Sequence, residues 1–340
     1  MKVYIRSTGN ISPQHSLDTD AFFLSRETTE YDYFKSIEPD YDNYVDNKMI
    51  RRMSRIIKMG VAASLTCLRN AEVENPAAIL TATAYGCLED SSAFLRRMIE
   101  YEEKLLSPTA FIQSTHNTVG SQIALLLKCH NYNNTIVHNA FSFENALTES
   151  RLLLQEGIGP VLVGAIDEIT NDLHTILSRF GLYRKPVGST GNIAGEGAAF
   201  FLLDKDPGKG YLAVLKGLRM IYRPENEESI HRSIADFLDE NKTTMDEIDL
   251  VLTSHTGNIK QDELDNRLLD SVYYGKSSFP FKSLCGDYPT ASGFALWMAV
   301  VILKEQIVPF WMKGTHTRLR NILIHNHSGN THHSFILIGK

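Results

Sequence analysis

The chain has little cysteine. Four cysteines occur among 340 residues, and Cys67, Cys87, Cys129 and Cys285 form no CxxC pair and follow no regular spacing. This pattern argues against a disulfide framework and against a zinc site built on cysteine. We therefore expect reduced thiols that pack as small apolar side chains in a cytoplasmic protein.

Long apolar stretches are also missing. No uninterrupted run of about 18 apolar residues occurs, so we expect no membrane span. The first residues, MKVYIRSTGNIS, include two early cations but no apolar run of the length found in signal peptides.

Positive charge is not in excess. The chain has 34 Lys and Arg against 40 Asp and Glu, a formal net charge of −6, which excludes the global basic field typical of nucleic-acid-binding proteins. Histidines gather near the C-terminus at His325, His327, His332 and His333, but no cysteine motif accompanies them. We expect no metal site, no other cofactor and no nucleic-acid partner.

What the chain does have is an alternation of helical and strand patterns. Residues 1–48 are acidic and tyrosine-rich and lack a clean period, so we expect an irregular surface arm there. Further on, NNTIVHN predicts a strand, AFSFENALTESRLLLQEG a turn and an amphipathic helix, and GPVLVGAID a second buried strand. This order favours an α/β protein with a mostly parallel sheet flanked by helices.

A charged segment with one proline and two glycines, DKDPGKG, marks an internal boundary. We expect an N-terminal half over residues 1–205, which includes the arm, and a C-terminal half over residues 206–340. Both halves contain a strand, a polar loop and then a helix, which starts near Ser142 in the first and near Thr290 in the second. This repeated layout predicts a two-lobed molecule.

Several segments, in chain order, resemble the β-ketoacyl synthases of the thiolase superfamily. TIVHNAFSFENAL is similar to the nucleophile elbow, IAGEGAAFFLLD to the Gly-Glu-Gly-Ala strand, VLTSHTGN to the loop with the first catalytic histidine and FKSLCGDYPTASGFALWMAV to the region of the second. VLVGAIDE and SGNTHHSFIL match a further strand and the gating loop. The resemblance covers residues 49–340 and implies a thiolase-like layered αβαβα fold with two pseudo-duplicated halves.

The same resemblance assigns the positions of the active site. Active members of the family attack a thioester with an elbow cysteine and use two histidines and a lysine. Phe141 falls at the cysteine, His255 at the first histidine, Lys282 at the lysine and Asp287 at the second histidine. A phenylalanine is no nucleophile, and a carboxylate at position 287 would repel the carboxylate of a malonyl substrate.

These departures imply a non-condensing subunit of the chain-length-factor kind, from a fatty-acid or polyketide pathway. Its expected partners are an acyl carrier protein or acyl-CoA, and either a second copy or an active ketosynthase. Residues 113–117 lie where members of the family approach the partner subunit.

Two alternatives stay open, and with them the question of whether the chain is an enzyme. An active acyltransferase or 3-oxoacyl synthase could use Ser142, next to the elbow position, with His255 as its base, or Cys285, two residues before Asp287. Ser142 has a second interpretation as the cap of the following helix, and Cys285 one as a small buried side chain. The other alternative is a non-catalytic acyl-binding protein.

Overall fold

The computed structural model describes the chain except residues 18, 30–31, 105, 185–190 and 313–317. In this part the strands form one sheet in the order β3-β2-β4-β5-β1-β6-β10-β9-β7-β8. The strands are β1 (Val3–Ile11), β2 (Ala78–Ala82), β3 (Tyr132–Ile136), β4 (Val161–Asp167), β5 (Gly197–Asp204), β6 (Ala213–Tyr222), β7 (Leu250–Thr253), β8 (Ser278–Pro280), β9 (Asn321–Ser328) and β10 (His332–Gly339).

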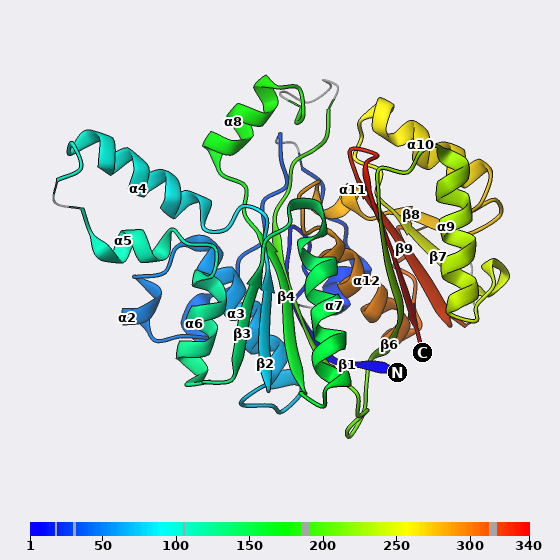
Figure 1. Cartoon of the computed structure of the whole chain (residues 1–340), viewed down its shortest axis with the longest axis horizontal. Helices are drawn as coiled ribbons and strands as arrows, with labels where there is room; N and C mark the ends of the chain where they lie inside the picture. Colours follow the sequence, from blue (N-terminus) through cyan, green and yellow to red (C-terminus); the bar gives the residue numbers. More distant parts are fainter. Residues whose placement is uncertain (18, 30–31, 105, 185–190, 313–317) are drawn as a thin grey trace.

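The helices of the described part lie on both sides of this sheet and between its halves (Figure 1). They are α1 (Thr19–Leu24), α2 (Asn47–Ile50), α3 (Arg55–Asn70), α4 (Leu88–Glu100), α5 (Pro108–Gln113), α6 (Thr118–Leu127), α7 (Ser142–Gln155), α8 (Asn171–Arg179), α9 (Glu227–Glu240), α10 (Ile259–Asp270), α11 (Lys282–Cys285) and α12 (Ser292–Glu305). Three short 3₁₀ turns are η1 (Tyr41–Asn43), η2 (Asn139–Phe141) and η3 (Met245–Glu247).

The two halves of the sheet repeat one topology. Read from its outer edge, the first half runs β3-β2-β4-β5-β1 and the second runs β8-β7-β9-β10-β6. In each half the first three strands are mutually parallel and the last two are antiparallel to their neighbours. The pseudo-duplication is confirmed, and β1 and β6 join the halves as an antiparallel pair.

The sheet is mixed, so the expectation of a mostly parallel sheet was wrong. The turn between β9 and β10 spans only residues 329–331, and so short a connection can join only antiparallel strands. The loop between β5 and β6 contains the predicted boundary segment. The division into domains at residue 205 stays a prediction.

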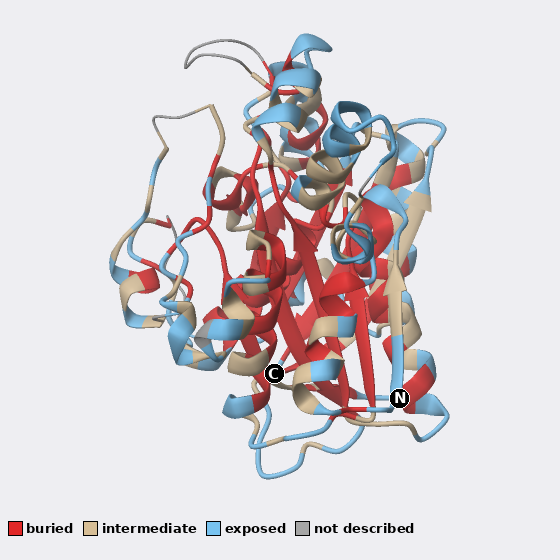
Figure 2. Cartoon of the chain, turned by 90° about the vertical axis from the view of Figure 1, so that its left-hand side faces the viewer, coloured by how far each residue is buried: buried red, intermediate tan, exposed pale blue. Residues whose placement is uncertain are grey.

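Helices and strands alternate in five layers. α7 and α12 lie between the two half-sheets and share one apolar core with both. α3 and α6 cover the outer face of the first half, and α9 and α10 cover the second. From Ser292 to Leu303 every residue of α12 is buried, as expected for a helix that is apolar on all sides. Figure 2 shows burial concentrated in the strands and in the parts of helices that pack against them.

The N-terminal arm departs from expectation at its start. Residues Val3–Ile11 form β1 at the centre of the sheet, between β5 and β6. Polar residues that are nevertheless buried hid the pattern of this strand. Among them, Ser7 donates to the carbonyl of Cys67 on α3 at 2.7 Å. Residues beyond it, with short α1, η1 and α2, are irregular as predicted.

α4 and α5 project away from the sheet (Figure 1). Neither helix has a buried residue, and they contact each other through Phe94 and Phe111, whose ring centroids are 5.6 Å apart. Across the described ranges, no helix combines the length and the apolar character needed to cross a membrane.

Candidate functional site

A sharp turn connects β3 to α7 at the predicted elbow. Asn139 adopts φ +51°, the left-handed conformation that asparagine tolerates better than most residues. The hydroxyl of Ser142 accepts a hydrogen bond from the His138 amide at 2.8 Å and donates to the Asn139 carbonyl at 3.0 Å. Ser142 is fully buried. Its hydroxyl thus fastens the turn, and both of its contacts are to backbone.

The ring of Phe141 is nearly buried, with 6% of the residue exposed. It stacks on His138 with 5.7 Å between ring centroids and meets His332 of β10 edge-on at 4.9 Å. The position assigned to the family cysteine is therefore filled by a ring that packs between two imidazoles.

Beside the elbow lies a pocket of about 370 Å³ where the two halves meet. Asn139 lines it, together with aliphatic residues of α8 and side chains from the segment 282–289 and the β9–β10 turn. Lys282 and Asp287 both face this pocket, as do the phenol rings of Tyr85, Tyr183 and Tyr288. Phe141, Ser142, His255 and Cys285 are not among its lining residues.

Lys282 and Asp287 form an ion pair with 2.8 Å between Nζ and Oδ1. The lysine side chain is 3% exposed, and its Nζ also donates to the carbonyl of His327 at 2.9 Å. The second carboxylate oxygen of Asp287 accepts from the side-chain amide of Asn192. Both charged groups therefore have protein partners inside the pocket wall.

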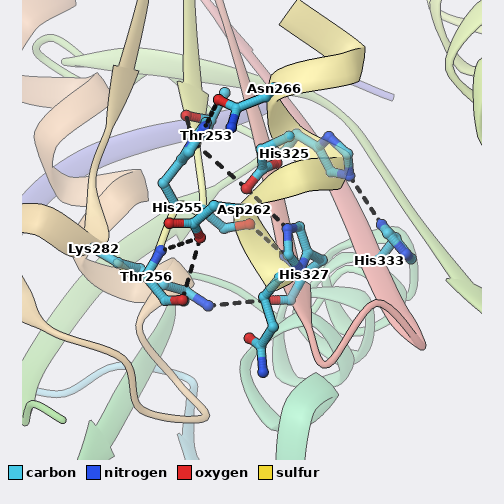
Figure 3. Close-up of polar contacts among 12 residues, drawn as sticks. Thr253, His255, Thr256, Asp262, Asn266, Lys282, His325, His327 and His333 are labelled. Carbon is cyan, nitrogen blue, oxygen red and sulfur yellow. Dashed lines mark hydrogen bonds and ion pairs between the residues drawn. The ribbon is translucent and has the colours of Figure 1, made fainter. Parts of the chain in front are cut away.

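His255 points away from this pocket, toward α10 (Figure 3). Its Nδ1 lies 3.0 Å from the hydroxyl of Thr253 and 3.6 Å from Asp265, and its Nε2 lies 3.1 Å from Asn266 Oδ1. The structure thus does not bring His255 together with Lys282 and Asp287.

Cys285 is fully buried beneath the loop that carries Asp287. Its thiol lies 3.3 Å from the Gly286 carbonyl and 3.7 Å from that of Phe281. Burial raises the pKa of the Cys285 thiol above its usual range. A protonated thiol with no access to solvent is a poor nucleophile.

Close backbone contact beside the pocket explains part of the Gly-Glu-Gly-Ala segment. A Cβ atom on Gly195 would lie 1.9 Å from the carbonyl oxygen of Cys285, so only glycine fits there. Between the two glycines of the motif, Glu196 is fully buried and receives two hydrogen bonds from Arg55. The Ser36 amide donates to Glu196 Oε1 at 2.8 Å, and the Gly195 amide donates to the carbonyl of Asp287 at 3.2 Å. These contacts hold the N-terminal arm and the segment 285–287 against β5.

Comparisons with known proteins agree with the resemblance seen in the sequence. Residues 35–180 match the family described as "Beta-ketoacyl synthase, N-terminal domain". Over these residues the chain resembles β-ketoacyl synthases. No curated protein sequence matches it.

Solved structures resemble the ketosynthase-like chain over its whole length. The ishigamide ketosynthase/chain length factor has a TM-score of 0.82 at 16% identity, covering 100% of this chain and 99% of that one. A ketosynthase in complex with its chain length factor from Xenorhabdus doucetiae has 0.74 at 13%, covering 99% and 98%. A type II polyketide-synthase acyl carrier protein in complex with its ketosynthase has 0.77 at 12%, covering 99% of each chain. The likeness confirms the thiolase-like fold.

A buried histidine cluster in the ketosynthase-like chain was missed as a unit. His325, His327 and His333 lie on one face of the β9–β10 hairpin (Figure 3), and His327 contacts Asp265 of α10. His327 Nε2 lies 2.9 Å from Asp265 Oδ2, and His325 Nε2 lies 3.1 Å from His333 Nδ1. Within the described residues no group of three or more His, Cys, Asp or Glu is arranged to hold a metal. The signal was the spacing of two between His325 and His327 on one strand.

Burial and charge shift the pKa values of this cluster in opposite directions. Burial alone would raise the pKa of Asp265, but the charge and hydrogen bond of His327 outweigh it and hold that pKa at about 2. Burial, aided by repulsion from His327, lowers the pKa of His333 to about 3. Burial and then the neighbouring His333 lower the pKa of His325 well below its usual range. His333 and His325 are therefore neutral beside an ionised Asp265.

The opposite face of the hairpin carries a second buried polar contact. Ser334 donates to Glu144 of α7 at 2.7 Å, and Glu144 is fully buried three residues beyond Phe141. Burial raises the pKa of Glu144, against the hydrogen bond from Ser334. No sequence motif pointed to Glu144, because a glutamate in the first turn of a helix is ordinarily an exposed residue.

Proposed function

We propose that the chain is a non-condensing subunit of the chain-length-factor kind, which pairs with an active ketosynthase in a cytoplasmic fatty-acid or polyketide-type pathway. The supporting observation is the elbow itself. Its ring, Phe141, packs between two imidazoles, and no cysteine is among the described residues that line the neighbouring pocket. Condensation by the family route needs a thiolate at this place to accept the acyl group.

The ion pair of Lys282 and Asp287 supports the same conclusion. A carboxylate neutralised by a buried ammonium and an amide has neither a proton to donate to an enolate nor a free charge to use. The pair closes the wall of the pocket at the positions that the resemblance assigns to the lysine and the second histidine of active relatives. We propose that Lys282 and Asp287 shape this pocket.

An active partner would cover a surface that the chain leaves open. β3 is the edge strand of the first half, with unpaired backbone groups on its outer side. Around it, Leu125 of α6 is 63% exposed, Val137 49% and Leu152 of α7 54%. A groove of about 670 Å³ runs between α6 and β3. Exposed apolar side chains beside a free strand edge are typical of a subunit interface.

The test is reconstitution with a cysteine-bearing ketosynthase and an acyl carrier protein. We expect a stable heterodimer and formation of 3-oxoacyl product only when both subunits are present. The variant Leu125→Asp should abolish the heterodimer, because it places a charge in an apolar contact. Ile259→Asp is the matched control, since Ile259 is 69% exposed but lies on α10, on the other half-sheet.

Three other outcomes would change the assignment. Product formed by the chain alone would show an active synthase with a rearranged site, with Ser142 or Cys285 as the nucleophile to examine first. Self-association through the Leu125 surface, with no response to a ketosynthase, would indicate a homodimer. Saturable binding of acyl-CoA in the 370 Å³ pocket, without any product, would indicate an acyl-binding protein.

A further inference from the structure

The two half-sheets separate along the edge of β1 that faces β6. β1 pairs with β6 only over Val3–Ile5, while its pairing with β5 continues to the end of the strand. Beyond this short pairing, side chains cap the carbonyls on the open edge. Asn70 of α3 donates to the carbonyl of Thr8 at 3.2 Å, and the hydroxyl of Ser16 donates to that of Asn10 at 2.9 Å. In the described part of the chain, no strand covers this stretch of β1.

A cavity of about 340 Å³ lies against the open edge of β1. Thr66 and Asn70 of α3 line it, and so do residues from the C-terminal half of α12. None of its lining residues lines the pocket beside the elbow, so the two cavities are separate. Its volume is at the low end of the range for small-ligand sites, roughly 300–1,000 Å³.

A buried donor in this cavity has no partner. Asn10 is 2% exposed and lines the cavity, and its amide nitrogen Nδ2 has no hydrogen-bond partner among the residues that the structure describes. Buried amides without partners are uncommon, because burial removes the hydrogen bonds that water would make. The cavity therefore presents a donor that selects a ligand with an oxygen acceptor.

α12 runs along β1 in the opposite direction. Near the start of α12, a Cβ atom on Gly293 would lie 3.4 Å from that of Ala199, the β5 partner of Asn10. Near its end, the carbonyl of Lys304 accepts from Nζ of Lys340 at 3.3 Å. Lys340 follows β10, whose end lies level with the start of β1 across β6. The helix thus extends from the level of Asn10 toward the first residues of β1.

Positive charge marks the end of the cavity away from Asn10. Arg6 comes four residues earlier on β1, roughly 13 Å along the strand. Its Nη1 contacts Asp204 at 3.2 Å, which uses one of the five N–H donors of the guanidinium. Lys304 contacts its neighbour Glu305 at 2.6 Å, and so exposed a pair contributes little. Two cations and one carboxylate therefore line this end, which favours an anionic group.

The wall between the two ends is apolar. Trp297 and Val301 of α12 and Leu212 before β6 line it. Trp297 is buried, and its ring is held edge-on against Phe22 with 4.7 Å between centroids. A hydrocarbon segment placed here would leave water for an apolar surface.

We propose that this cavity binds a small organic acid, with a carboxylate toward Arg6 and Lys304, a hydrocarbon middle against Trp297, and a second oxygen that accepts from Asn10. Guanidinium and ammonium groups make charge-assisted hydrogen bonds to carboxylates. The site is independent of the proposed function, because no residue lines both cavities.

The experiment compares adipate, hexanoate and hexane-1,6-diol, which share one carbon chain and differ only at its ends. Binding to the full chain is measured by calorimetry. We expect adipate to bind on the order of tenfold more tightly than hexanoate, which lacks the acceptor for Asn10, and than the diol, which lacks the charge. Absence of adipate binding, or equal affinities for adipate and hexanoate, would overturn the proposal.

Variants assign the two ends of the ligand. Asn10→Leu should remove the advantage of adipate over hexanoate and stay folded, because the replaced amide nitrogen has no partner. Lys304→Gln should weaken adipate and hexanoate by the same factor. Asn75→Leu is the matched control for Asn10→Leu, since Asn75 is an exposed asparagine outside the cavity, and it should keep the advantage. An advantage that survives in Asn10→Leu would contradict the assignment.

The two tryptophans of the chain locate the bound ligand, because Trp297 lines the cavity and Trp311 does not. The indole N–H signals are followed by nuclear magnetic resonance during titration with adipate, and the variant Trp311→Phe assigns them. We expect the Trp297 signal to move with the calorimetric Kd, and to move further than that of Trp311. Saturable binding that leaves the Trp297 signal in place would put adipate at another site and refute the proposal.

Discussion

At the scale of single residues, the pocket depends on one buried pair. Removing the carboxylate of Asp287 would leave the ammonium of Lys282 buried with only a carbonyl partner. Breaking a buried pair in this way costs roughly 3 kcal/mol or more. We expect Asp287→Asn to lower the free energy of unfolding by about that amount in urea denaturation. The double variant Lys282→Met/Asp287→Asn should recover most of the loss, and a single variant as stable as the parent would contradict the account.

The elbow residue supports a second prediction. Phe141→Cys restores the family residue type, yet position 141 does not line the pocket and His255 is engaged by Thr253 and Asn266. We expect this variant to form no acyl-enzyme when incubated with acyl-CoA, as measured by intact-protein mass spectrometry. Stoichiometric acylation of the introduced thiol would show that the substitution alone had removed the activity.

The sequence placed two of the candidate residues near each other where one motif carries both. Lys282 and Asp287 lie five residues apart in one motif, and the structure brings them into contact. His255 follows a different strand, and its direction depends on Asn266 and Asp265 of α10, which no motif marked. The catalytic roles assigned to Phe141, His255, Lys282, Asp287, Ser142 and Cys285 stay predictions.

At the scale of elements, the β9–β10 hairpin makes stability depend on pH. The pKa of His333 is lowered to about 3 in the folded chain, so below its ordinary value near 6.5 the unfolded chain binds a proton that the folded chain does not. The depressed pKa values of His325 and Asp265 act in the same direction, the latter only below about pH 4. Stability should therefore fall as the pH decreases from 6.5 toward 3.

The measurement is the free energy of unfolding at pH 7 and pH 5 for the parent and His333→Phe. One histidine contributes at most about 1.4 kcal/mol per pH unit, so the parent should lose about 2 kcal/mol more than the variant over this interval. If the free energy of unfolding fell by the same amount in the parent and the variant, His333 would take up a proton in the folded state near its ordinary pKa.

Packing between backbone segments gives another prediction at this scale. Gly195→Ala would place a Cβ atom 1.9 Å from the carbonyl oxygen of Cys285 and 2.7 Å from the Cα atom of Gly286. Both are backbone atoms, which cannot move aside as a flexible side chain could. We expect a loss of stability of about 3 kcal/mol or more by thermal or urea unfolding, as for other overpacked sites. Gly210→Ala is the control, because nothing lies within 4 Å of the added atom.

The sequence predicted the helices and strands whose apolar and polar residues follow a regular pattern. The pattern of α9 gave its bounds, Glu227–Glu240, and the all-apolar run after Ser292 gave α12. β1 was missed because Ser7, Thr8 and Asn10 are polar yet buried between neighbouring strands and α3. A strand that is buried on both faces does not show the usual alternation of apolar and polar residues.

At the scale of the whole molecule, two half-sheets of the same topology make up the fold. The proposed function depends on the side chains at the elbow and in the pocket where the halves meet. Motifs in chain order predicted the layered fold and its two halves, because their spacing is set by the strands that carry them. They could not predict that β5 and β10 run antiparallel to their neighbours. Nor could they predict that apolar side chains are exposed around β3. The antiparallel turn depends on loop length, which no motif specified. The proposed heterodimer is the property to test at this scale.

The most direct test of the central claim is covalent labelling. The chain and a cysteine-bearing ketosynthase partner are incubated together with radiolabelled acyl carrier protein, separated under denaturing conditions and counted. The account predicts label on the partner alone, and none on either chain when the partner's cysteine is replaced by alanine. Label bound covalently to this chain would contradict it.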